Sequence, residues 1–163
     1  MFRGARLEIG GAAIGLLFLP SLQTDYEMKC EGASEKNGQL DWIVHFQQRK
    51  DRPGRTATFW VDKVAHPGVF KGRAWMSQEN FQVVHLEASL VTGVPDIGLD
   101  GLTVSVDYRL VPSMSGTLKL WLPESMSTYW DYTAHRLVIT HSFSDFQLFT
   151  VESTEKAQEP RKP

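Results

Sequence analysis

Histidine and acidic side chains are the groups of this 163-residue chain that could do acid–base or metal chemistry near neutral pH. The five histidines are His45, His66, His85, His135 and His141. His135 and His141 share one face of a predicted strand, but six residues at about 3.3 Å each place them roughly 20 Å apart. His85 and Glu87 also share a strand face, so an enzyme would need a further partner from another strand. We interpret each histidine as an ordinary hydrogen-bonded side chain.

Motifs that signal catalysis or cofactor binding do not occur in the sequence. It contains no phosphate-binding loop, nucleophile elbow, zinc-protease motif or dinucleotide fingerprint. Asp96 and Asp100 flank a glycine-containing loop, but a calcium loop needs a denser ladder of oxygen ligands. The single cysteine, Cys30, excludes an internal disulfide, and its alternation with charged residues predicts a buried thiol. We therefore predict no enzyme activity, no catalytic residue, no metal site and no cofactor.

Large aromatic side chains are more informative than the polar residues. Each carries about 150 to 250 Å² of surface, and a single curved sheet cannot easily cover all of them. One interpretation is that they fill an ordinary core. The other is that they line an apolar face that holds a hydrophobic ligand. The residues predicted for such a face are Trp42, Phe46, Trp60, Trp75, Tyr108, Trp121 and Trp130.

The elements that must position these aromatic residues are strands. From residue 25 onward apolar and polar residues alternate with period two, most clearly from Leu102 to Leu110. Asn37-Gly38 is a hairpin turn signal, and Pro123 is expected to separate two strands. Helices, if any, belong to the first 24 residues or to the tail. The pattern predicts a mainly β fold: an antiparallel, strongly curved sheet or an unclosed half barrel.

Length and composition favour a single domain. We expect a signal-like segment or an N-terminal strand over residues 1–24, one β domain over 25–152 and a disordered tail over 153–163. The apolar stretch from Ile9 to Leu19 is too short for a stable transmembrane span. The formal charge of −2 has no basic block, so nucleic acid is an improbable partner.

Two stretches carry a resemblance to a known family. Residues Gly72–Glu87, which contain Trp75 and His85, form a predicted strand-turn-strand unit. The second stretch runs from Leu120-Trp121-Leu122-Pro123 to Phe149. Both resemble segments of the bacterial lipoprotein-sorting proteins of the LolA-like and RseB-like superfamily, in an uncharacterised branch. The resemblance implies an unclosed antiparallel barrel in the cell envelope, periplasmic or exported, without catalytic residues.

These observations lead to two functional hypotheses. The first is a non-enzymatic binding domain of the bacterial cell envelope that shelters an acyl chain, a lipoprotein or another hydrophobic ligand on its concave face. The second is a structural or interaction module with an envelope protein as partner, for example the C-terminal part of a larger exported protein. In the second hypothesis the aromatic face is fully buried.

Overall fold

The computed structural model describes residues 6–8, 11–36, 38–52, 58–61, 63–112 and 119–146, and strands make up most of this part of the chain. Within it, helical structure is confined to three short segments: η1 (Gly11–Phe18), α1 (Pro20–Gln23) and η2 (Pro95–Ile97). The prediction of a mainly β fold with few helices after residue 24 is confirmed. The tail predicted over residues 153–163 lies outside the described residues.

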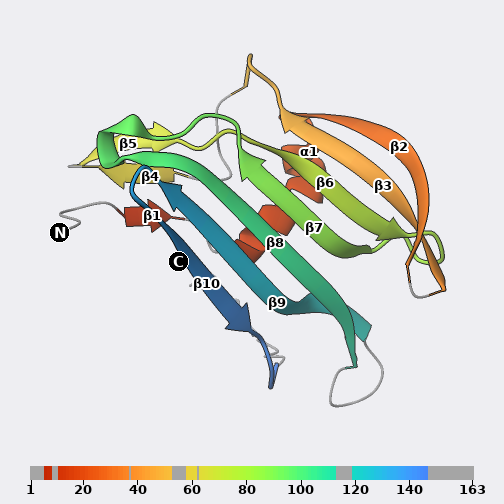
Figure 1. The fold of residues 1–163 in the computed structure, drawn as a ribbon. Coiled ribbons are helices and arrows are strands. Elements are labelled where there is room, and N and C mark those ends of the chain that lie inside the picture. Colours follow the sequence, from red (N-terminus) through yellow and green to blue (C-terminus); the bar gives the residue numbers. More distant parts are fainter. Residues whose placement is uncertain are drawn as a thin grey trace, which may run out of the picture.

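One antiparallel sheet of seven strands dominates the fold, in the order β10-β9-β8-β7-β6-β3-β2. It stays open, with β10 and β2 as its two edges, as expected for an unclosed sheet (Figure 1). The strands follow one another along the chain apart from the excursion between β3 and β6. Their bounds are β2 (Tyr26–Lys36), β3 (Gln39–Gln48), β6 (Phe70–Ser77), β7 (Val83–Leu90), β8 (Leu99–Pro112), β9 (Lys119–Tyr132) and β10 (His135–Ser142).

Turn chemistry explains where the first hairpin reverses. Lys36 pairs with Gln39, so only residues 37 and 38 connect β2 to β3, as the Asn37-Gly38 signal predicts. Gly38 has a φ of 77°, a conformation that a side chain at Cβ would disfavour. The alternating residues before and after this turn therefore face each other in register.

Pro123 does not end a strand, which differs from the prediction. β9 runs through it, and the register shifts between Asp107 and Tyr108 of β8, leaving Glu124 as the extra residue of a bulge. The pairing of β9 with β10 reaches only to Ser125, so Pro123 lies in a part of the strand with a partner on one side. A missing backbone donor is tolerated there.

The excursion between β3 and β6 forms a separate small sheet. Its strands are β1 (Arg6–Glu8), β4 (Thr58–Val61) and β5 (Val64–Pro67), in the order β1-β4-β5. No sequence pattern indicated that β4 lies outside the large sheet, in which β3 pairs directly with β6. Phe59 of β4 is buried and meets the Trp130 ring edge to face at 6.5 Å.

The N-terminal segment covers one face of the large sheet, which we call the core face. In Figure 1, η1 and α1 lie behind β6, β7 and β8. Ile14 and Leu17, three residues apart on the 3₁₀ helix η1, are both buried in the hydrophobic cluster that includes Phe46 and Leu86. Two of the three short helical segments thus fall within the first 24 residues, as the sequence predicts, whereas η2 is a single 3₁₀ turn that the sequence pattern did not predict.

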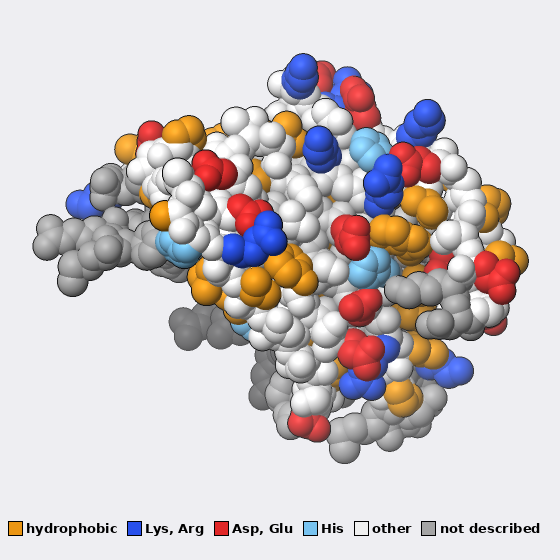
Figure 2. Space-filling model, in the orientation of Figure 1, with side chains coloured by type: hydrophobic (Ala, Val, Ile, Leu, Met, Phe, Trp, Pro, Cys, Tyr) orange, Lys and Arg blue, Asp and Glu red, His pale blue; other side chains and the backbone are white. Residues whose placement is uncertain are grey.

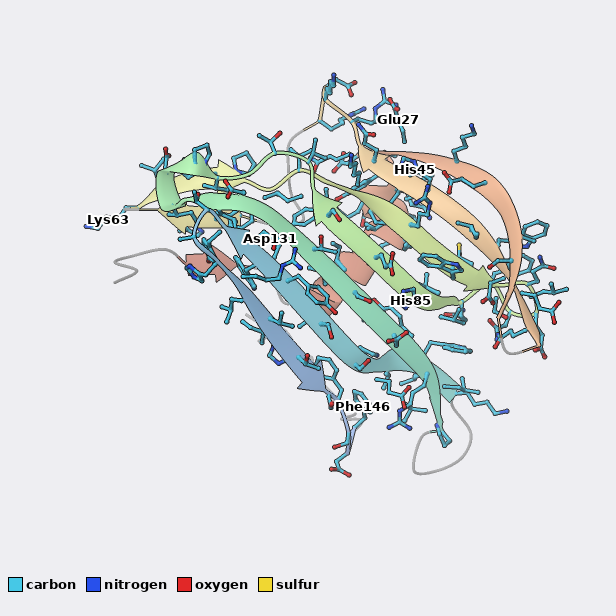
Figure 3. The ribbon with its side chains drawn as sticks, in the orientation of Figure 1. Glu27, His45, Lys63, His85, Asp131 and Phe146 are labelled. Carbon is cyan, nitrogen blue, oxygen red and sulfur yellow. The ribbon has the colours of Figure 1, made fainter. Side chains whose placement is uncertain are left out.

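The opposite face of the large sheet, which we call the polar face, is turned towards the viewer in Figures 2 and 3. Acidic, basic and histidine side chains gather over it, with hydrophobic side chains between them (Figure 2). His45 of β3 and His85 of β7 both belong to it (Figure 3). One covered face and one wet face produce the alternation seen in the sequence.

Candidate functional site

Five of the seven aromatic residues predicted for a ligand face lie on the core side of the sheet. This placement follows from the strand register, because residues paired directly across an antiparallel sheet share a face. Phe46 pairs with Gly72, and Gly72 with Ala88, which is buried in the core. The same reasoning along each strand gives the set Trp42, Phe46, Tyr108, Trp121 and Trp130.

Phe46 is the centre of the aromatic packing on this face. It is completely buried, and its ring meets the edges of Phe18 and Tyr26, each with a ring-centroid distance of 6.1 Å. Gly72 makes room for it, because a Cβ at that position would lie 2.7 Å from Cζ of Phe46. Phe46 is therefore part of the core rather than the lining of an open site.

Tyr108 marks where η1 rests on the sheet. Its Oη lies where a Cβ on Gly15 would project, so the glycine allows close approach of the helix. Burial raises the pKa of Tyr108 to about 12. Among the described residues its hydroxyl has no hydrogen-bond partner. A buried hydroxyl without a partner is costly, so this contact is held by the packing around it.

Apolar side chains on the core side extend beyond the area that η1 covers. Trp42 is 38% exposed, and Leu40 and Leu110 near the same end of the sheet are also exposed. Leu137 and Ile139 lie on the core side of β10 and are exposed as well. Leu16 of η1 and Leu19, just after η1, are also exposed. We call these seven residues the apolar rim.

The other two aromatic residues of the predicted set lie elsewhere. Trp60 follows the buried Phe59 on β4, so it points to the outer side of the small sheet, where it is exposed. Trp75 lies on the polar face, paired with His85. The alternation along β6 could have indicated this placement. Trp75 has the same strand parity as Lys71 and Arg73, whereas Phe70, Gly72 and Ala74 have the parity of the core face.

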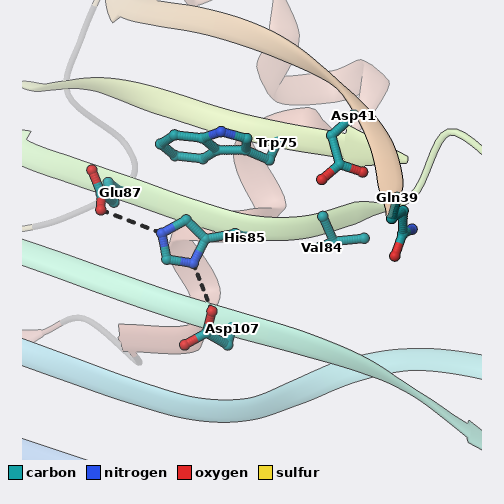
Figure 4. A pocket seen from close by; sticks show the side chains of 7 residues that line it. All are labelled: Gln39, Asp41, Trp75, Val84, His85, Glu87 and Asp107. Carbon is teal, nitrogen blue, oxygen red and sulfur yellow. Dashed lines mark hydrogen bonds and ion pairs between the residues drawn. The ribbon is translucent and has the colours of Figure 1, made fainter. Parts of the chain in front are cut away.

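On the polar face, Trp75 belongs to a groove of about 350 Å³ (Figure 4). The His85 ring lies 4.9 Å from the indole ring. Its Nδ1 is 2.7 Å from Oδ1 of Asp107, and its Nε2 is 3.3 Å from Oε1 of Glu87. Ser125 donates a hydrogen bond of 3.2 Å to the other oxygen of Asp107. Sequence reasoning noted that His85 and Glu87 share a face but missed Asp107.

The other four histidines do not line this groove, and His45 lines a second groove on the polar face. His66 contacts Asp96 at 3.5 Å, His135 stacks on Tyr132 with ring centroids 5.0 Å apart, and His141 stacks on Phe143. In the described part of the chain, no group of three or more His, Cys, Asp or Glu residues could hold a metal ion. Cys30 is exposed rather than buried, because it lies on the edge strand β2 next to the bulge at Glu31.

No helix among the described residues is long and apolar enough to cross a membrane. Comparisons of the chain with protein-family models, with curated proteins and with solved structures find no match. Function is therefore inferred from the two faces of the sheet.

Proposed function

We propose that this protein is a non-enzymatic binding domain of the bacterial cell envelope, which shelters an acyl chain or another hydrophobic ligand on its core side. One observation carries the proposal: η1 covers only part of the apolar face, and the apolar rim remains exposed around it. Large apolar side chains left exposed on the side of the sheet that carries the core are candidate contacts for an apolar partner.

The rim offers contacts that suit a flexible chain. Leu40 and Trp42 are two residues apart on β3 and share its face, and Leu110 of the rim pairs with the half-buried Trp121 across β8 and β9. Burial of this surface supplies about 25 cal/mol per Å² without any directional chemistry. The envelope location and the lipoprotein class of ligand rest on the resemblance of Gly72–Glu87 and Leu120–Phe149 to the LolA-like proteins.

The test is the binding of palmitate, measured by its displacement of the solvatochromic dye 1-anilinonaphthalene-8-sulfonate. Trp42→Ala is expected to weaken palmitate binding about fivefold, the equivalent of about 40 Å² of lost apolar contact. Trp75→Ala is the matched control, because it removes the same side chain from the opposite face. Equal weakening by both substitutions, or no palmitate binding by the parent protein, would refute the proposal.

A second candidate is an interaction module whose rim is covered by a protein partner. Two grooves, one around His85 and one around His45, both lie on the polar face, so neither of them offers a cavity beside the apolar rim. This candidate predicts that the chain self-associates or pairs through the rim rather than binding palmitate. Sedimentation would then show a concentration-dependent assembly that Leu137→Asp abolishes.

A further inference from the structure

The groove on the polar face has a chemistry that the proposed function does not use. Seven described residues line it: Gln39, Asp41, Trp75, Val84, His85, Glu87 and Asp107. They come from four adjacent strands, β3, β6, β7 and β8, so the sheet itself sets their spacing (Figure 4). A volume of about 350 Å³ is in the range of small-molecule sites.

The lining of this groove is rich in carboxylates. Three of the seven residues are acidic, and no lysine or arginine is among them. Arg73 lies on the same face, but its guanidinium is held by Glu31, with Nε 2.6 Å from Oε2. Arg73 thus forms its direct ion pair with a carboxylate outside the groove, and it also attracts the Glu87 carboxylate electrostatically.

The groups that would meet a ligand are held in place before it arrives. His85 has a carboxylate within hydrogen-bond reach of each ring nitrogen, which fixes the plane of the imidazole beside the Trp75 indole. Asp41 is only 4% exposed at one end of the groove, whereas the Glu87 side chain is 56% exposed. One oxygen of Glu87 contacts His85 and the other is available to a guest.

We infer that this groove binds a small organic cation of the alkylammonium class. An ammonium group is attracted to the face of an indole ring and to nearby carboxylates, and tryptophan is the most favourable ring for such a contact. The negative lining also raises the local concentration of cations. The site lies on the opposite face from the apolar rim, so it can be tested independently of the proposed lipid-binding function.

Calorimetry at low ionic strength with 1,5-diaminopentane tests the inference, with 1,5-pentanediol as the neutral compound of the same length. Saturable binding of the diamine and none of the diol is the expected result. Trp75→Ala should weaken diamine binding about tenfold and Trp75→Phe less, since phenylalanine retains part of the cation–π attraction. Equal binding of the diol would overturn the inference in favour of a neutral, sugar-like ligand.

Two charge-neutralising variants keep the test decisive if Trp75→Ala does not fold. Glu87→Gln should weaken diamine binding about fivefold. Glu124→Gln removes the same charge from a side chain of nearly equal exposure, 57%, that does not line the groove, and should change binding less than twofold. Equal effects of the two variants would show that only net charge matters and would overturn the site.

The source of the ammonium group is resolved by a further probe. N-acetyl-lysine N-methylamide presents the same group as a protein side chain would. Tighter binding of this compound than of the diamine assigns the groove to a lysine of a partner, and weaker binding assigns it to a free amine. In either case, amide chemical shifts should change on β6, β7 and β8. Changes confined to η1 and the apolar rim would contradict the inference.

Discussion

The two faces of the large sheet have the same backbone but different physical tasks. On the core face, Phe46, Leu86 and Val106 are completely buried, and their contribution comes from area removed from water. On the polar face, Glu31 with Arg73 and His85 with Asp107 form contacts between partly solvated groups. The difference teaches that stability resides mainly on one face, so that the other can carry a ligand chemistry of its own.

The largest difference between the two faces is expected when one methyl group is added to each of them. Gly72→Ala should destabilise the fold by about 3 kcal/mol, because its Cβ would collide with Phe46 and with the backbone of Glu87. Gly101→Ala should change stability by less than about 0.5 kcal/mol, because its Cβ would lie 3.7 Å from the nearest atoms, those of Asp131. Urea denaturation measures both. Similar losses would show that the polar face is packed as tightly as the core.

Alkaline pH tests the burial of the core face. Burial raises the pKa of Tyr108 from its ordinary value of 10 to about 12. The unfolded chain therefore loses this proton first, and stability should fall as pH rises from 10 to 12, by up to about 2.7 kcal/mol from this group. Tyr108→Phe should make that part of the decline disappear in denaturation curves recorded between pH 9 and 12. An unchanged slope in the variant would mean that Tyr108 is solvated.

The smallest effect is expected from an ion pair on the polar face. The Arg73 guanidinium hydrogen-bonded to Glu31 lowers the pKa of that carboxyl below 4.5. The pair therefore stabilises the fold above pH 4.5 and ceases to do so as pH falls through the lowered pKa. Arg73→Gln should return the Glu31 pKa towards 4.5 in carbon-detected NMR titrations. Because the pair is exposed, the melting temperature at neutral pH should barely move.

Local patterns were sufficient to predict a fold built mainly of strands and the position of its first turn. Asn37-Gly38 indicated the first hairpin, and the alternation from Leu102 to Leu110 lies within β8. The prediction that Pro123 separates two strands was wrong, because β9 has a bulge there and is paired on one side only, so the strand continues through the proline. The candidate site was harder to predict, since Trp75 was grouped with the core aromatics although its phase matched Lys71 and Arg73.

Long-range register decided what no local pattern could. Asp107 meets His85 because β7 and β8 pair with these two residues opposite each other, 22 positions apart in the chain. The exclusion of β4 and β5 from the large sheet likewise depends on pairing with β1. Neither the spacing nor the composition of the segments contains this information.

The amino-acid sequence by itself determined where the chain is extended, where it turns and which residues of a strand share a face, because these follow from backbone geometry over a few residues. Only the tertiary structure decided which face became the core. That choice depends on what covers the sheet, here Ile14 and Leu17 of η1, and on how seven strands align. It left Trp42 beside the covered surface and Trp75 in a polar groove on the other side.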